Sequence, residues 1–116
     1  YEDLFPRETK RGGAWMNPLR SQGMFKGVIS RPHISLTCNL SKPTDNAPSL
    51  LTISEVKTIF HEFGHCLHGL LSKRKYKLIG GTSVFWDFVE LPSQSMENWG
   101  GEKFCCMSGY VNEYVK

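Results

Sequence analysis

Residues 59–71 read IFHEFGHCLHGLL, and the other features of the chain are best understood from this stretch. It places His61 and His65 four residues apart, with Glu62 directly after the first. In an α-helix each residue advances by about 100°, so the two imidazoles point about 40° apart and can reach one metal ion. Glu62 then lies about 60° to one side of His65, where a carboxylate contacts a metal-bound water better than the metal itself. This HExxH spacing therefore predicts two zinc ligands and a general base.

The residues around this motif favour a packed helix over a solvated one. Between Lys57 and Lys73 the only formally charged side chain is Glu62, whereas a solvated helix face usually carries several charges. His61, His65 and His68 share one side of the helix, which is therefore expected to be covered. Apolar residues at helical spacing predict a core-facing stripe on roughly the opposite side: Val56, Ile59, Phe60, Phe63, Leu67, Leu70 and Leu71.

Local signals also predict where this helix begins. Thr52 followed three residues later by Glu55 is a capping box, in which each side chain satisfies a backbone donor of the other, so the helix is expected to start near residue 53. Gly64 and Gly69 inside the helix each weaken it by up to about 1 kcal/mol relative to alanine. Glycine is tolerated there where another group must approach the backbone closely, and a neighbouring strand or a peptide substrate are the candidates.

A hydrolytic zinc usually has three protein ligands and one open position, so a third ligand is required. His68 lies seven residues from His61, about 10 Å along the helix axis, which is too far for bonds of about 2 Å. We expect it to act beside the site or in packing. The extended HExxHxxGxxH pattern is excluded, because position 68 is histidine and Leu71 stands where a histidine is required. The carboxylates downstream are Asp87, Glu90, Glu97, Glu102 and Glu113.

Two further stretches resemble a known family. HEFGHCLH at 61–68, followed by GTSVFWDFVELPSQSMENW at 81–99, resembles the thimet oligopeptidase family of zinc peptidases, peptidase family M3, which includes oligopeptidase A and peptidyl-dipeptidase Dcp. YEDLFPRETKRGGAW at 1–15 is similar to an upstream stretch of that family, in the style of its Dcp-like branch. The resemblance implies that His61, His65 and Glu90 bind one Zn²⁺ and that Glu62 is the base. Two motifs in order at family spacing are more specific than either alone.

The residues around Glu90 fit this role and leave one detail open. Pro92 belongs in the first turn of a helix, so a second helix either starts near Pro92 or is kinked there, with Glu90 at its entrance. Given the implied ligands, Asp87 is a candidate to orient a histidine through the ring nitrogen that faces away from the metal. A simple helix cap is the alternative for Asp87.

The order of the elements predicts an α+β fold. GAWM, GVIS and HISLTCNL, between Gly13 and Leu40, have the composition of short strands, and residues 41–51 form a turn into the zinc-motif helix. We expect one partial zinc-binding domain over 1–116, strand-rich over 1–51 and helical over 52–116. Members of the resembled family are several times longer, so the chain is expected to be part of a larger, mainly α-helical enzyme. The resemblance implies a sheet edge for the peptide, with HISLTCNL as its counterpart; a plain hairpin is the alternative.

The composition of the chain gives no support for binding to nucleic acid or to a membrane. Of the 116 residues, 40% are hydrophobic and 22% charged, and the formal charge of +3 is too small to argue for nucleic acid or a membrane. No stretch is long enough to span a bilayer, and no signal peptide is visible. The cysteines, Cys38, Cys66, Cys105 and Cys106, lack the spacing of a disulfide framework, which favours a cytoplasmic location. Cys66 is expected to be small packing filler.

The expected activity is hydrolysis of short peptides by a zinc-bound water, with Glu62 taking its proton and delivering it to the leaving amine. The resemblance implies that oxyanion donors come from a later His/Tyr-rich segment. Residues 100–116 carry no such motif, and Tyr110 and Tyr114 are expected to pack, so the remainder of the parent enzyme is a required partner. Endopeptidase and dipeptide-releasing action both stay open. The alternatives are a non-catalytic zinc-stabilised domain and a closed structural site that recruits Cys105 or Cys106.

Overall fold

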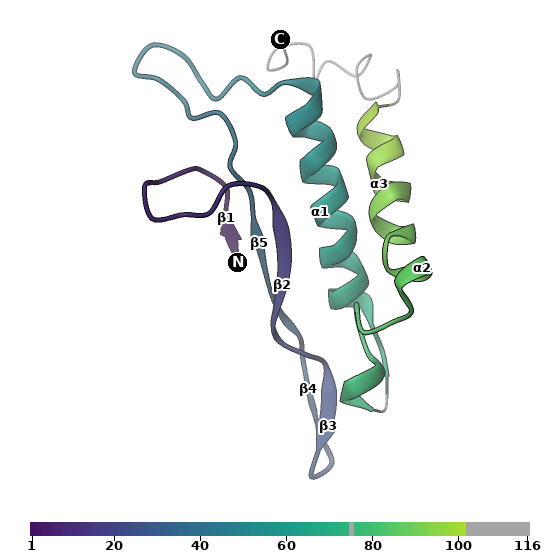
Figure 1. The fold of residues 1–116 in the computed structure, drawn as a ribbon. Helices are drawn as coiled ribbons and strands as arrows, with labels where there is room; N and C mark the ends of the chain where they lie inside the picture. Colours follow the sequence, from purple (N-terminus) through teal and green to yellow (C-terminus); the bar gives the residue numbers. More distant parts are fainter. Residues whose placement is uncertain (75, 102–116) are drawn as a thin grey trace.

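The computed structural model describes residues 1–74 and 76–101. A small sheet packs on one side of a long helix, and a shorter helix runs antiparallel to the long one on its other side (Figure 1). The described strands all precede the described helices, so the predicted α+β class is confirmed. None of these helices combines the length and apolar character that crossing a membrane requires. The strands are β1 (Glu2–Asp3), β2 (Trp15–Arg20), β3 (Gly23–Phe25), β4 (Val28–Ser30) and β5 (His33–Thr37). The helices are α1 (Ile53–Leu71), the 3₁₀ turn η1 (Lys77–Ile79), α2 (Trp86–Val89) and α3 (Leu91–Gly101).

The main sheet has the strand order β1-β5-β2, with β1 parallel and β2 antiparallel to β5. β3 and β4 form a separate hairpin. β5 is thus the central strand, and the expectation that HISLTCNL offers a free sheet edge is wrong. A period-two apolar pattern identifies which residues of a strand are buried, but it carries no information on how many neighbours the strand has. β2 is the edge strand on the other side of β5.

The core lies between β5 and α1. Ile34, Leu36, Cys38 and Leu40 alternate along the chain, so their side chains leave the same face of the extended segment, and all four are buried. Cys66 of α1 completes this cluster and is 4% exposed, which confirms its role as small packing filler. The face of α1 that includes Cys66 therefore packs against the sheet, which fixes the orientation of this helix.

The predicted apolar stripe of α1 is wrong in part. Phe63, Leu70 and Leu71 are 40%, 45% and 76% exposed in the described chain. The buried residues of α1 are instead Glu62, Gly64, Cys66 and Gly69. The reason is that α1 packs on two sides, against the sheet and against α3, and close packing selects small residues over bulky ones (Figure 1).

The two helical glycines mark these close contacts. A Cβ atom on Gly69 would lie 2.3 Å from Cδ1 of Ile34, so the group that approaches Gly69 is the neighbouring strand, one of the two predicted candidates. A Cβ atom on Gly64 would lie 2.5 Å from the Cα of Ser93 and 2.7 Å from the carbonyl oxygen of Pro92. Gly64 therefore allows the start of α3 to touch the backbone of α1.

Replacing Gly64 with alanine is expected to destabilise the protein by about 1–3 kcal/mol, although alanine is the better helix former. The added methyl meets backbone atoms of Ser93, which cannot rotate away, so α3 must move. Urea denaturation measures the change. Gly101→Ala is the matched control, because its methyl meets the flexible Lys57 side chain at 3.2 Å. Equal stabilities of the two variants would contradict the close contact.

The start of α1 is capped as the sequence predicts. The Thr52 hydroxyl accepts a hydrogen bond from the Glu55 amide at 3.2 Å, and a Glu55 carboxylate oxygen accepts from the Thr52 amide at 2.7 Å. The other Glu55 oxygen accepts from the amide and hydroxyl of Ser41 at 2.7 and 2.9 Å. These hydrogen bonds, the one from the Thr52 backbone foremost, hold the pKa of Glu55 at about 2. Glu55 thus joins the helix to the loop before it.

This arrangement predicts a pH-dependent loss of stability. Because the folded pKa of Glu55 is below its ordinary value of 4.5, its contribution is complete above about pH 4.5 and lost as the pH falls towards about 2. Glu55→Gln is expected to cost about 1 kcal/mol at pH 7 and much less near pH 2.5. Urea denaturation of both proteins at the two pH values gives the difference. A difference that does not change with pH would contradict the assignment to this carboxylate.

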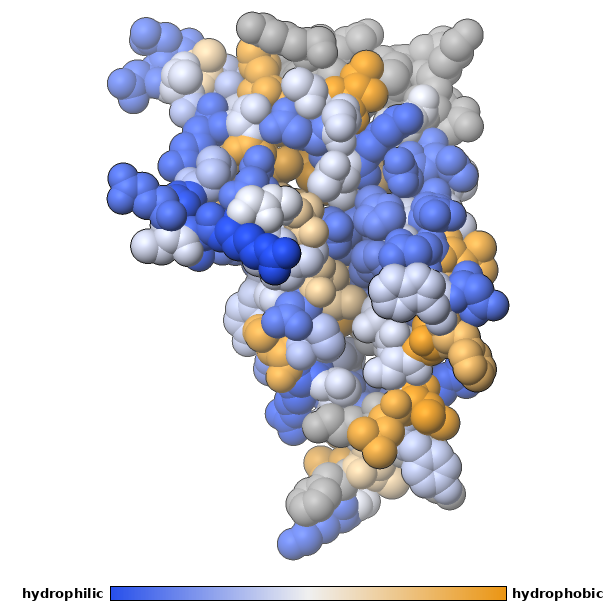
Figure 2. All heavy atoms as spheres, viewed as in Figure 1, coloured by the Kyte–Doolittle hydropathy of each residue, from blue (hydrophilic) through white to orange (hydrophobic). Residues whose placement is uncertain are grey.

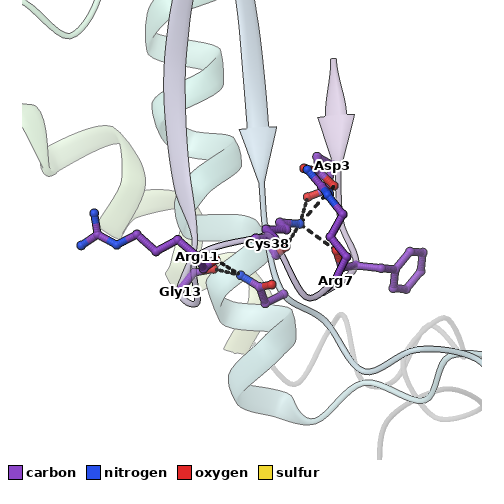
Figure 3. Close-up of polar contacts among 8 residues, drawn as sticks. Asp3, Arg7, Arg11, Gly13 and Cys38 are labelled. Carbon is purple, nitrogen blue, oxygen red and sulfur yellow. Dashed lines mark hydrogen bonds and ion pairs between the residues drawn. The ribbon is translucent and has the colours of Figure 1, made fainter.

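The segment between β1 and β2 is held by a buried cation. The Lys10 side chain is 3% exposed, and its ammonium group donates to the carbonyl oxygens of Asp3, Phe5 and Cys38 and to the Asp3 carboxylate (Figure 3). Asp3 also accepts two bonds from Arg7, at 2.7 and 2.8 Å. One lysine therefore ties the N-terminal strand, its loop and the end of β5 together.

Candidate metal centre

The two histidines of the HExxH motif meet a single carboxylate. His61 and His65 lie one turn apart on α1, and their rings pack edge to face with centroids 5.0 Å apart. The Nε2 atom of each lies 3.3 Å from the same oxygen, Oε2 of Glu90. Within residues 1–74 and 76–101 these three side chains are the group whose ligand atoms converge as a metal requires, all within 4.8 Å of one another. The structure thus brings together His61 and His65, which the HExxH spacing predicts as ligands, and Glu90, which the family resemblance implies as the third.

The spacing of these atoms fits zinc. Two ligand atoms that share a tetrahedral zinc at bonds of about 2.0–2.1 Å lie about 3.3 Å apart. The two distances from Nε2 to Glu90 Oε2 have this value. Two imidazoles and one carboxylate are also a donor set that zinc takes in hydrolytic sites. His65 is largely buried, with 12% of its side chain exposed, whereas His61 and Glu90 are 28% and 41% exposed, so the centre lies at an accessible edge.

Glu90 stands at the junction of two helices. It follows α2 directly, and α3 begins at Leu91 with Pro92 in its first turn, so Glu90 lies at the entrance of the helix as predicted. The hydroxyl of the fully buried Ser93 lies 2.7 Å from Glu90 Oε2 and 2.9 Å from the Glu90 carbonyl oxygen, and its one proton is shared between these two acceptors. Ser93 therefore fixes the oxygen that faces both histidines. The sequence analysis missed Ser93, although a serine three residues into a helix is a common partner for the residue before it.

Glu62 is buried beside this group. It is 8% exposed, on the side of α1 that faces β2, where the Met16 backbone donates a hydrogen bond to it. Burial raises the pKa of the Glu62 carboxyl, and the neighbouring His61 and His65 oppose this rise. A carboxylate whose pKa is raised is a stronger proton acceptor, which suits a general base. Glu62, which the sequence predicts as the base, is thus a buried carboxyl group close to the two histidines.

The ring nitrogen of His61 that faces away from Glu90 contacts Glu97, and not Asp87, the candidate from the sequence for orienting a histidine. Nδ1 of His61 lies 3.3 Å from Oε2 of Glu97, on α3. Asp87 is exposed in the first turn of α2 and makes no hydrogen bond or ion pair with the residues that the structure describes. The sequence contained a signal for Glu97: it follows Glu90 by seven residues, or about two helical turns, so a helix that starts at Glu90 carries both carboxylates on one side.

His68 packs beside the site, as its distance along the helix predicts. Its ring lies edge to face with Phe88 of α2, with centroids 6.0 Å apart, and it is not in the converging group. Burial lowers the pKa of His68. Nδ1 of His65 and Nδ1 of His68 are buried with no hydrogen-bond partner in the described part of the chain. The other residues considered from the sequence lie outside the described residues: Glu102, Cys105, Cys106, Tyr110, Glu113 and Tyr114.

Several known proteins are similar in sequence to this chain. Oligopeptidase A of Escherichia coli is 51% identical over 102 residues, which cover 85% of this chain and 15% of that protein. The dipeptidyl carboxypeptidase of Salmonella typhimurium is 46% identical over 99 residues, 85% of this chain and 14% of that protein. Probable cytosolic oligopeptidase A of Arabidopsis thaliana is 45% identical over 105 residues, again 85% and 15%. The chain therefore spans about one seventh of the length of these relatives.

Two conclusions follow from these identities. Oligopeptidase A and the dipeptidyl carboxypeptidase both match the chain, at 51% and 46% identity, so both kinds of relative support the same family. The sequence profile of peptidase family M3 matches residues 1–104, which include the HExxH helix, Glu90 and Glu97. The family resemblance seen in the sequence is thereby confirmed, and the chain belongs to peptidase family M3.

Proposed function

We propose that the protein is a zinc-dependent metallopeptidase that hydrolyses peptide bonds in short oligopeptides. His61, His65 and Glu90 would hold one Zn²⁺, and Glu62 would be the general base. The observation that carries the proposal is the convergence of two Nε2 atoms on one carboxylate oxygen at 3.3 Å, with Glu62 buried on the same helix. Membership of a peptidase family supports it independently.

The chemistry divides between the metal and the chain. Zinc bound there would activate a water molecule and polarise the scissile carbonyl group. Glu62 would accept the proton that this water loses as its oxygen bonds to the carbonyl carbon. It would then donate the proton to the amide nitrogen as the carbon–nitrogen bond breaks. The burial of Glu62 on α1 keeps its carboxylate close to the two histidines.

The proposed substrates and partners extend beyond this chain. Two relatives are named oligopeptidase A, which supports short peptides as the substrate. The remainder of the parent enzyme is a proposed partner, supported by large apolar side chains that α2 and the turn before it leave exposed (Figure 2). Leu78, Phe85 and Trp86 are each 88% exposed. A cytoplasmic location is also proposed, with the free thiols of Cys38 and Cys66 and a relative named cytosolic in support.

Removing the metal is expected to abolish the activity. In the complete protein, a zinc chelator should stop cleavage of a fluorogenic oligopeptide, and added zinc should restore it. His65→Ala is expected to weaken zinc binding by more than the roughly 10–100-fold that loss of an outer contact causes. His68→Ala is the matched control on the same helix and should keep one zinc per chain. Zinc content is measured by atomic absorption together with the peptide assay.

Zinc content, peptide hydrolysis and zinc X-ray absorption together distinguish the peptidase from a non-catalytic zinc domain and from a closed structural site. Zinc bound without any hydrolysis would contradict the peptidase and favour a non-catalytic zinc-stabilised domain. Zinc X-ray absorption that detects sulfur ligands, lost in Cys105→Ser or Cys106→Ser, would point to a closed structural site. Nitrogen and oxygen ligation together with turnover is the result that the proposal requires.

A further inference from the structure

We propose that Glu97 is a positioning residue that holds the His61 ring ready to bind the metal. This inference rests on the proposed zinc site and deepens it. It assigns to α3 a second contribution beyond that of the junction residue Glu90. From the sequence, Glu97 was only one of several downstream carboxylates, and Asp87 was the candidate for orienting a histidine.

The geometry places the His61 ring between two carboxylates. Its Nε2 atom lies 3.3 Å from Glu90 Oε2, and its Nδ1 atom lies 3.3 Å from Glu97 Oε2. Both ring nitrogens are therefore occupied, and the ring cannot rotate without losing one of the contacts. Glu90 directly precedes α3 and Glu97 lies within it, and α3 packs along α1 through the Gly64 contact.

The chemistry of the contact sets the direction of the hydrogen bond. An ionised carboxylate only accepts, so His61 must donate its Nδ1 proton to Glu97. A neutral imidazole has one N–H group, and with the proton on Nδ1 its Nε2 atom presents a lone pair. That lone pair faces the Glu90 oxygen and the His65 ring, and two electron-rich atoms at 3.3 Å are stabilised by a cation between them. Glu97 therefore selects the form of His61 that a metal needs.

The two histidines differ in this respect. Nδ1 of His65 is buried without a hydrogen-bond partner among residues 1–74 and 76–101. Among those residues, the hydrogen-bond contact of Glu97 with the centre is therefore the one to His61. Glu97 is 40% exposed and His61 28% exposed, so the contact is close to the surface and removing it does not open the core. This separates a positioning role from a packing role.

The test measures zinc affinity in the complete protein. Metal-free wild-type, Glu97→Ala and Glu97→Gln proteins are titrated with zinc in competition with a fluorescent chelator. The dissociation constant is expected to rise about 10–100-fold in Glu97→Ala. It should rise less in Glu97→Gln, because the amide oxygen still accepts from Nδ1. Asp87→Asn is the matched control, because it removes an exposed carboxylate near the site, and its zinc affinity should stay within about twofold of wild type. The visible absorption of the cobalt-substituted proteins gives a second readout of ligand geometry and should change in the same order.

The zinc affinities and melting temperatures of the Glu97 variants together test the positioning role. The order wild type, Glu97→Gln, Glu97→Ala in rising dissociation constant, with the melting temperature of metal-free Glu97→Gln unchanged, supports the inference. Wild-type affinity in Glu97→Ala overturns it. So does weakened binding in Glu97→Ala alone with a lowered metal-free melting temperature, because loss of packing then explains the effect. Failure of the wild type to bind zinc would refute the proposed function, which distinguishes that failure from one confined to Glu97.

Discussion

Glu62→Gln is expected to lower kcat of the complete protein by about 10²–10⁴-fold while leaving its zinc content unchanged. Glutamine has nearly the same shape as glutamate, and its amide oxygen can still accept the hydrogen bond from the Met16 backbone. It cannot take a proton from water. The substitution should therefore remove proton transfer without disturbing the helix or the three ligand side chains. Steady-state hydrolysis of a fluorogenic oligopeptide, with zinc analysis of the same samples, checks both parts.

The control for this experiment is Glu8→Gln, because Glu8 is exposed in the loop after β1. This variant should keep both activity and zinc. A Glu62→Gln protein that retained more than about a tenth of wild-type kcat would show that another group accepts the proton. Loss of zinc from Glu62→Gln would show that Glu62 supports the metal and is not only a base. Either result would require a different assignment of roles within HExxH.

Lys10→Met is expected to destabilise the protein by about 3 kcal/mol. Methionine fills similar space but donates no hydrogen bond, so the carbonyl oxygens of Asp3 and Cys38 lose a donor in partly buried surroundings. The cost is assigned to these carbonyl oxygens and not to the ion pair, because Asp3 is 39% exposed and keeps Arg7 as a partner. Urea denaturation at neutral pH measures the change in the free energy of unfolding.

Lys42→Met provides the comparison, since Lys42 is exposed in the loop before α1. Its substitution should change the free energy of unfolding by less than about 0.5 kcal/mol. A Lys10→Met protein as stable as Lys42→Met would show that the ammonium group gains little over water. In that case the hydrogen bonds in Figure 3 would not be what holds the N-terminal strand on the sheet.

Features that depend on neighbouring residues were predictable from the sequence. The capping box identified Ile53 as the first residue of α1, because Thr52 and Glu55 satisfy each other within one turn. Pro92 likewise placed Glu90 at a helix entrance, since proline tolerates only the first turn. HExxH spacing brought His61 and His65 to one side of a helix for the same local reason. Glu90, in contrast, was assigned through the family resemblance.

Features that depend on how elements cross were not predictable. The Glu97 contact joins residues 36 positions apart, and only the packing of α3 along α1 brings it about. The order of the strands and the packed side of α1 are of the same kind: the bulky residues suggested one face, but Gly64 and Gly69 mark the faces that contact α3 and β5. Small residues in a helix that is otherwise large and apolar were the better indication of where other elements approach.

The buried thiols make the contact between sheet and helix measurable in time. Cys38, at the end of β5, is 0% exposed, and Cys66 faces it from α1 within the same cluster. Burial raises the pKa of the Cys38 thiol, so the packed state offers a labelling reagent neither access nor thiolate. Labelling of these thiols then requires a local opening in which α1 separates from the sheet. The labelling rates of Cys38 and Cys66, followed separately from those of the other cysteines, therefore report how often the helix that carries the histidines separates from the sheet.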